Sequence, residues 1–179
     1  MITIEDSAEL QLRTISNLVS LETRNANVEG CQEITIRDLI KASLRMRPDR
    51  IVVGEVRGKE AIDMLQSVNV GHSAMTTVHA NSVRDVVSRL ETMVLMGMEM
   101  PLVAIRRQII SGFDVVIHLG RLKDGSRKVL EIAEPVGFKG EEVEMHTLFR
   151  YGRGDGSVLG ELKKVGEICS EKRCKEPVF

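Results

Sequence analysis

The sequence predicts an α/β fold, with a parallel sheet and flanking helices, followed by a β-rich antiparallel extension. Up to Gly112, short apolar runs that suit buried strands alternate with amphipathic stretches that suit helices. This alternation favours parallel strands joined by right-handed crossovers. From Val115 onward, strand-like segments follow one another with turn signals between them, as is typical of antiparallel hairpins.

The chain begins with a strand and then a helix. Ile2 and Ile4 indicate a buried strand that starts at the first residues of the sequence. Residues 35–46 are predicted to form a helix, because Thr35 and Asp38 make a capping box ahead of one apolar face.

A second strand and helix follow. The continuous apolar run 51–53 ends at Gly54, which suits a strand buried on both faces of a sheet. Helical spacing resumes over residues 59–70 and ends at Gly71. Residues 74–78 are then predicted to be another strand.

Two helices complete the α/β part. The first runs over residues 82–97, and Ser82 with Asp85 forms a second capping signature at its start. The next runs over residues 101–112, because Pro101 is a favourable first helical residue.

The C-terminal part is predicted to be antiparallel. Turn signals at 123–126 and 139–140 separate three strand-like segments, at 115–119, 128–136 and 142–150, and the glycines of 152–157 suit a flexible turn. The expected organisation is an α/β core in 1–112, a β-rich extension in 113–162 and a poorly ordered tail in 163–179.

Composition excludes several functional classes. A chain of 179 residues with 42% hydrophobic composition is long enough for a packed core. The net charge of -1 and the 3% aromatic content disfavour a nucleic-acid binder. No apolar stretch approaches the roughly 18 residues that a membrane span needs, so we expect a cytoplasmic protein.

The cysteines indicate reduced thiols. Cys31, Cys169 and Cys174 form no CxxC pair and have no histidine beside them at metal-ligand spacing. The sequence therefore argues against a structural zinc site.

Candidate chemistry lies where two predicted strands end. Glu55 follows the first of them closely and His79 follows the second, and ligands of open α/β sheets bind beyond such ends. An apolar strand followed by an acid is also the form of a Walker B element. By itself the pattern also fits a turn in which Glu55 pairs with Arg57, and His79 also fits a structural cap ahead of Ser82.

Four segments, in order, are similar to motifs of the type II/IV secretion ATPases, with CpaF-type pilus-assembly ATPases as the nearest subgroup. ITIEDSAEL resembles the Asp box, SLRMRPDRIVVGEVRG contains the Walker B match, GHSAMTTVHANS resembles the His box, and LETR is the fourth match. The resemblance covers roughly residues 1–150 and implies a partial RecA-like P-loop NTPase core.

The resemblance also implies roles for individual residues. Glu55 would support Mg²⁺ and the hydrolytic water as the Walker B glutamate, and Glu5 and Asp6 would add carboxylates around the metal and the water. Glu55 and Glu5 would act on the metal through water. His79 would approach the γ-phosphate end of ATP and respond to the nucleotide state.

Arginines gather around these motifs. A guanidinium suits a phosphate or a carboxylate across a subunit interface, and the alternative is that these residues only solvate turns. The candidates for phosphate or inter-subunit contacts are Arg24, Arg45, Arg47 and Arg57.

The sequence contains no GxxxxGK followed by Ser or Thr, the loop whose amides and lysine hold nucleotide phosphates. In the resembled family this loop lies upstream of the Asp box. We therefore expect a fragment of a hexameric motor ATPase for protein export or pilus assembly, which uses ATP and Mg²⁺ in its full form and binds ATP weakly or not at all alone.

The resemblance further implies self-association into a ring with full-length subunits. It also implies contact with an inner-membrane platform protein, a peripheral position at the inner face of the membrane, and no nucleic-acid partner. The alternative is a non-catalytic interaction module that docks onto full-length subunits and regulates them.

Overall fold

This computed structural model describes residues 1–26, 30–153 and 160–169. Contacts divide the chain into two compact units, one of residues 1–79 with 89–108 and one of residues 80–88 with 109 onward. The sequence instead assigned residues 1–112 to the core, so the structure groups the end of the last predicted helix with the extension.

A four-stranded parallel sheet forms the centre of the first unit. Its strands are β1 (Ile2–Glu5), β2 (Val19–Glu22), β3 (Arg50–Val53) and β4 (Ser73–Thr76). They lie in the order β2-β1-β3-β4 and every pair is parallel, as predicted. β2 was not predicted, because it carries no apolar run and is mostly exposed. β2 is a strand because it pairs in parallel with β1.

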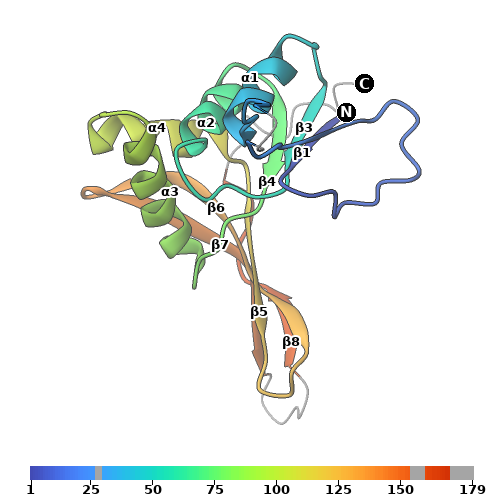
Figure 1. Ribbon diagram of the computed structural model, residues 1–179. Coiled ribbons are helices and arrows are strands. Elements are labelled where there is room, and N and C mark those ends of the chain that lie inside the picture. The colour runs from blue at the N-terminus through green and yellow to red at the C-terminus, as the bar shows by residue number, and fades with distance from the viewer. Residues whose placement is uncertain (27–29, 154–159, 170–179) are drawn as a thin grey trace. The chain divides into compact units, whose positions relative to one another are not determined.

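Helices α1 (Ile36–Leu44) and α2 (Ala61–Asn69) accompany this sheet (Figure 1). α1 contacts β1 and β2, and α2 contacts α1 and β4. The predicted capping box is confirmed, because the Asp38 amide donates to Thr35 Oγ1 at 3.3 Å and the Thr35 amide donates to Asp38 Oδ2 at 3.0 Å.

The core of this unit is aliphatic. Fully buried side chains come from β1, α1, β3 and α2, and they include Ile4, Ile40, Ile51, Ile62 and Leu65. The predicted apolar runs and helix faces supply all of these positions except Ile62, so the sequence pattern and the observed packing largely agree.

Two further helices follow, α3 (Val83–Gly97) and α4 (Leu102–Gly112). The Asp85 amide donates to Ser82 Oγ at 3.1 Å, which confirms the predicted start of α3. Glu91 of α3 and Arg106 of α4 form a largely buried ion pair at 2.7 Å.

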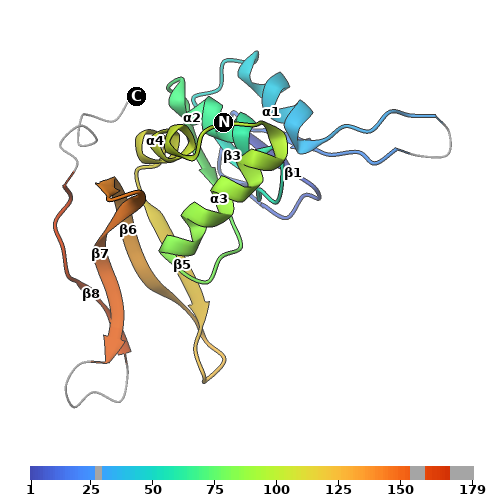
Figure 2. The same ribbon diagram turned by 90° about the vertical axis from the view of Figure 1, so that its left-hand side faces the viewer.

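The second unit contains an antiparallel sheet, visible as the long strands of Figure 2. Its strands are β5 (Val116–Arg121), β6 (Arg127–Lys139), β7 (Glu142–Arg153) and β8 (Gly160–Lys164), in that order. The predicted turns are confirmed: Gly125 and Gly140 adopt positive φ angles of 84° and 64°, a conformation that glycine permits at little cost.

The structure extends the strand pattern beyond the prediction. β8 was not predicted, and residues 163–164, assigned to the tail from the sequence, belong to it. Part of the glycine-rich segment 152–157 and the last residues of the tail, 170–179, lie outside the described residues. Within the described ranges, the helices are too short or too polar to cross a membrane.

Candidate functional site

The candidate site lies at the carboxyl ends of β1, β3 and β4. Because these strands are parallel, the residues that follow them meet at one edge of the sheet. The pairing continues past the strands, since the Gly54 amide donates to Ile4 O at 2.8 Å and the Val56 amide donates to Thr77 O at 3.1 Å. The backbone therefore positions the loops that carry the candidate side chains.

Four charged or titratable side chains form a connected row at this edge. Arg57 lies 3.7 Å from Asp6 Oδ2 through one guanidinium nitrogen and donates to Glu55 Oε1 through the other. Glu55 Oε2 lies 3.5 Å from His79 Nε2. The structure thus brings together Asp6, Arg57, Glu55 and His79, which come from three different strand ends.

Glu55 is the most enclosed member of this row. Its Oε2 is buried and has no hydrogen-bond partner among the described residues, whereas the His79 side chain beside it is 88% exposed. The hydrogen bond from Arg57 is the main reason that the pKa of Glu55 lies below its ordinary value, and the charges of Arg57 and His79 act in the same direction. Glu55 is therefore a carboxylate at neutral pH with one oxygen left to bind a further group.

The ion pair between Arg57 and Glu55 lowers the pKa of Glu55, and this effect can be tested. Its lowered pKa stabilises the folded chain at neutral pH, and this contribution is lost as the pH falls through the folded-state pKa. Replacing Arg57 by alanine should raise the pKa of Glu55, which a ¹³C NMR titration of its side-chain carboxyl would measure.

Lys59→Ala is the matched control for this titration. It also removes one positive charge from an exposed residue nearby, but Lys59 is not among the groups that shift the pKa of Glu55. An unchanged Glu55 pKa in Arg57→Ala, or an equal rise in both variants, would contradict the assigned cause.

Glu5 lies at the end of β1, and its carboxylate is hydrogen-bonded to backbone amides. It is buried, and its Oε1 accepts hydrogen bonds from the amides of Glu9 and Leu10 at 3.1 and 3.0 Å. Its side chain also lies close beneath Gly54, where an added Cβ would come within 3.1 Å of Glu5 Cγ. In this structure Glu5 thus holds the loop after β1 and lies against the turn that carries Glu55.

The other arginine candidates lie away from the row. Arg24 bonds to Gln32 O at 3.2 Å and forms an isolated bridge with Ile34. Arg45 caps the end of α1, and Arg47 has a φ angle of 51° in the turn before β3. Arg45 and Arg47 therefore precede β3, whereas Glu55 follows it. Four residues of strand separate these ends by about 13 Å. Within one chain neither arginine meets Glu55.

Several supporting residues were not predicted. Thr23 donates to Asp6 Oδ1 at 3.2 Å, and Thr77 donates to Gly54 O at 2.7 Å. Glu60 accepts hydrogen bonds from the amides of Arg57 and Gly58 at 2.6 and 2.9 Å. Thr23 and Thr77 lie inside the segments that resemble family motifs. That position is the one sequence signal that could have identified them as site residues. Their role as hydrogen-bond donors required the tertiary structure.

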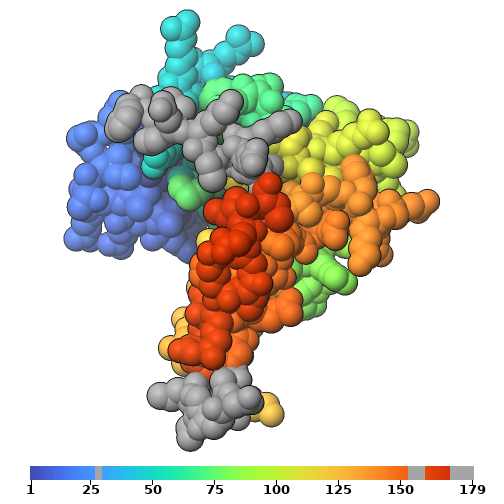
Figure 3. All heavy atoms as spheres, turned by 180° about the vertical axis from the view of Figure 1, so that it is seen from behind, coloured from blue at the N-terminus to red at the C-terminus, as the bar shows by residue number. Residues whose placement is uncertain are grey.

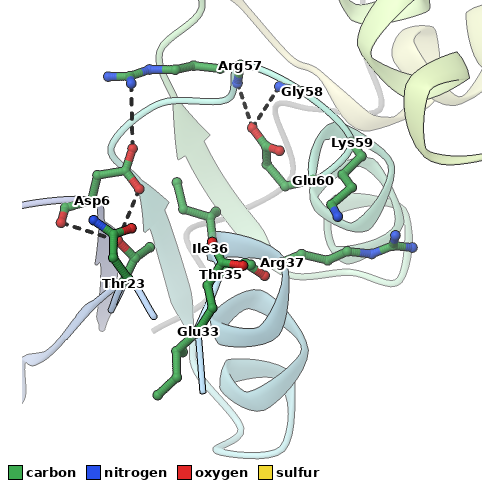
Figure 4. A pocket seen from close by; sticks show the side chains of 12 residues that line it. Asp6, Thr23, Glu33, Thr35, Ile36, Arg37, Arg57, Gly58, Lys59 and Glu60 are labelled. Carbon is green, nitrogen blue, oxygen red and sulfur yellow. Dashed lines mark hydrogen bonds and ion pairs between the residues drawn. The ribbon is translucent and has the colours of Figure 1, made fainter. Parts of the chain in front are cut away.

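A pocket of about 410 Å³ adjoins this row (Figure 4). Asp6 is paired with Arg57 and accepts a hydrogen bond from Thr23, and Glu60 is bonded to the backbone of Arg57 and Gly58. Basic and acidic side chains line it together, namely Arg37, Arg57 and Lys59 with Asp6, Glu33 and Glu60. The mixed charge suits a polar ligand more than an apolar one.

The residues present fit one part of a nucleotide site. The buried Oε2 of Glu55, which has no hydrogen-bond partner among the described residues, suits a cation-bound or attacking water, and Asp6 supplies a second carboxylate within reach of Arg57. The phosphates of a nucleotide need a glycine-rich amide cradle with a lysine, and the 179-residue sequence has no such motif. The site therefore fits the water-and-metal side of phosphoryl transfer.

Comparison with known proteins shows relatives in bacterial transfer and secretion systems. The family described as Type II/IV secretion system protein matches residues 1–156. A Mycobacterium tuberculosis protein whose name assigns it provisionally to conjugal transfer is 40% identical over 166 residues, which cover 90% of this chain and 46% of the relative. The type IV secretion system protein VirB11 of Brucella suis is 38% identical over 124 residues, which cover 66% of this chain and 34% of the relative.

Solved structures give the same picture. The VirB11 ATPase of the Brucella suis type IV secretion system, in complex with sulphate, aligns with a TM-score of 0.64 at 36% identity and covers 73% of this chain and 38% of its own. The pilus retraction motor PilT with bound ADP aligns at 0.52 and 24% identity, covering 74% and 36%, which supports the fold alone. The chain spans less than half the length of these relatives.

Proposed function

This chain belongs to the type II/IV secretion system protein family, a family of RecA-like secretion ATPases, and from that premise we propose that it supplies the acid and histidine side of an ATP-hydrolysing site. The observation that supports this proposal is the row of Asp6, Arg57, Glu55 and His79 across three strand ends. The phosphate anchor is supplied by residues outside these 179.

In this proposal each residue has a definite task. Glu55 orients the attacking water and accepts its proton through the buried Oε2, while Arg57 holds the other oxygen and keeps the carboxylate charged. Asp6, held by Thr23, adds negative charge next to Arg57. Glu55 would hold Mg²⁺ through water when ATP is bound, and the metal would supply positive charge that neutralises the polyphosphate.

His79 is proposed to respond to the nucleotide. Its exposed imidazole lies beside Glu55 and can donate to a phosphate oxygen. Glu5 is proposed to act on the metal shell indirectly, by holding the loop that carries Asp6. Arg24, Arg45 and Arg47 remain proposed contacts to a neighbouring subunit. Arg24 is bonded to Gln32 O, and Arg45 and Arg47 lie at the opposite end of β3 from Glu55.

The proposed assembly is a ring of subunits that couples ATP hydrolysis to protein export or pilus assembly at the cytoplasmic face of the membrane. An inner-membrane platform protein is the proposed partner of that ring. The CpaF-type subgroup remains a prediction.

Nucleotide binding tests the proposal that this chain lacks the phosphate-binding part of the site. The chain alone is expected to show no Mg-ATP binding in the micromolar range by isothermal titration calorimetry, because backbone amides and a lysine are the main phosphate contacts of such sites. Fusing the P-loop-bearing part of Brucella suis VirB11 upstream of Met1 should restore binding. Micromolar binding of Mg-ATP by the chain alone would show that the missing anchor is not required.

A second function is favoured by the edge of the parallel sheet. β4 is an edge strand of that sheet, and Met75 on it is 58% exposed. An unpaired strand edge with an apolar residue is suited to docking another polypeptide. The alternative proposal is thus a non-catalytic module that adds to full-length subunits through β4.

Pull-down with intact Brucella suis VirB11 discriminates between the two functions. A docking module should be retained, should lose retention in Met75→Lys, and should keep it in Glu55→Gln. If intact VirB11 does not retain the chain, the docking proposal is excluded for that relative.

A further inference from the structure

A second cluster of chemically capable side chains lies in the antiparallel sheet. Glu134 of β6 and His146 of β7 are direct cross-strand partners, and Cys169 lies five residues beyond the end of β8. One ligand atom from each, a carboxylate oxygen, a ring nitrogen and the thiol sulfur, lies within 4.8 Å of the other two. None of these residues takes part in the row around Glu55.

The segment that carries Cys169 is held against the sheet. The amides of Val165 and Gly166 both donate to Leu148 O, at 2.8 and 3.2 Å. Figure 3 shows β8 and the residues that follow it, in red, lying along the orange strands. Gly166 permits this approach, because a Cβ at this position would lie 2.4 Å from Thr147 O and 2.8 Å from His146 Nε2.

Glu134 is a deeply buried carboxylate. The residue is 2% exposed, and its Oε1 accepts a hydrogen bond of 2.6 Å from the Cys169 amide. Burying a carboxylate is costly unless it is paired or coordinates a metal. Glu144 adds a second negative charge near the Cys169 thiol. The local field therefore favours a cation.

One ring nitrogen of His146 contacts the backbone of the segment that carries Cys169. Its Nε2 lies 3.0 Å from Glu167 O, and in the tautomer that donates this hydrogen bond the other ring nitrogen keeps its lone pair. Metal-bound histidines commonly donate one ring N–H to a backbone carbonyl, which fixes the ring and the tautomer. The contact with Glu167 thus links the orientation of His146 to the segment that carries Cys169.

We propose that Glu134, His146 and Cys169 bind one divalent cation of the zinc class, with water at the fourth position. Thiolate, imidazole and carboxylate are the ligands that Zn²⁺ takes in proteins, and three protein ligands leave an open position. Tetrahedral coordination places ligand atoms about 3.3 to 3.6 Å apart at these bond lengths. The three ligand atoms lie within 4.8 Å of one another, so they have to close by no more than about 1.5 Å.

This site was not expected from the sequence. The cysteines have no histidine at ligand spacing, and the three ligands are spread over residues 134 to 169. The β6–β7 register and the return of the chain after β8 bring them together.

Cobalt substitution tests the proposal on the full chain. Wild-type protein titrated with Co²⁺ should saturate at one equivalent and show a thiolate charge-transfer band in the near ultraviolet. The double variant C31S/C174S, which leaves Cys169 as the one cysteine of the sequence, should keep the band. Cys169→Ser should lose it.

Affinity for Zn²⁺ gives a second readout that does not depend on the thiol band. His146→Asn should weaken competitive Zn²⁺ binding by more than about 100-fold, because even outer-shell changes cost 10- to 100-fold. His118→Asn on β5 is the matched control and should leave the affinity unchanged. Circular dichroism checks that each variant keeps its strand signal.

Three results would overturn the site. These are no saturable binding of Co²⁺ by the wild type, a band that persists in Cys169→Ser, or equal Zn²⁺ affinity of His146→Asn and wild type. If the charge-transfer band is lost in C31S/C174S but kept in Cys169→Ser, the metal is bound by other thiols. That result would also reject the proposed site.

Discussion

Replacing Glu55 by glutamine is expected to reduce ATP hydrolysis by about 10²- to 10⁴-fold, the range that a positioned general base contributes. Glutamine keeps the shape of the side chain but removes the charge, so it cannot accept a proton from water at Oε2. Because Glu55 does not anchor phosphates in the proposed site, Mg-ATP affinity should change little. The rate would be measured by phosphate release from the fusion that carries the VirB11 P-loop segment.

Glu22→Gln is the matched control for this experiment. Glu22 ends the neighbouring strand β2, pairs in register with Glu5 and is exposed. It also is an acid at the carboxyl end of a parallel strand, so its substitution tests whether any such acid matters. Hydrolysis by the Glu55→Gln fusion at the rate of the wild-type fusion would remove Glu55 from the catalytic role.

Truncating Ile4 to alanine is expected to lower the free energy of unfolding by about 2 to 5 kcal/mol, the usual cost of an Ile→Ala change in a core. Ile4 is 0% exposed and lies in β1, which pairs with β2 on one side and β3 on the other. Since domains are commonly stable by only about 5 to 15 kcal/mol, the loss is a large fraction of the total. Urea denaturation followed by circular dichroism would measure it.

The same chain offers a matched control at an exposed isoleucine. Ile15 is 37% exposed, so Ile15→Ala should change the free energy of unfolding by no more than about 0.5 kcal/mol. Equal denaturation midpoints for Ile4→Ala and wild type would contradict the assigned core.

The exposed edge at β4 bears on the stability of the wild type. An apolar residue such as Met75 on an unpaired strand edge favours association over a stable monomer. We therefore expect the isolated chain to be marginally stable and prone to association. Sharp, concentration-independent melting of a monomer would argue against that expectation.

Residues at strand ends were predictable because periodicity and turn chemistry are local. The apolar run 51–53 located the end of β3 and hence Glu55, and the capping signatures at Thr35 and Ser82 located the starts of α1 and α3. The parallel pairing then followed from the alternation of elements, since crossovers place such ends at one edge.

The partners of these residues were not predictable. The sequence offered Glu55 and Arg57 as a pair, but Asp6 joins them only because β1 lies between β2 and β3. Glu5 was grouped with Asp6 by sequence, yet the pleat turns successive side chains to opposite faces. Glu5 is buried and bonded to the loop backbone, whereas Asp6 is exposed.

The sequence by itself determined the class of fold and the family, because apolar periodicity, capping residues and ordered motifs are local properties. It proposed Asp6, Glu55, Arg57 and His79 only as members of a larger set of candidates. Only the tertiary structure decided which of the candidates meet, that β2 and β8 are strands, and that Glu134, His146 and Cys169 lie together. The physical reason is that strand order and register join residues far apart in the chain, and neither is written in the spacing of any one segment.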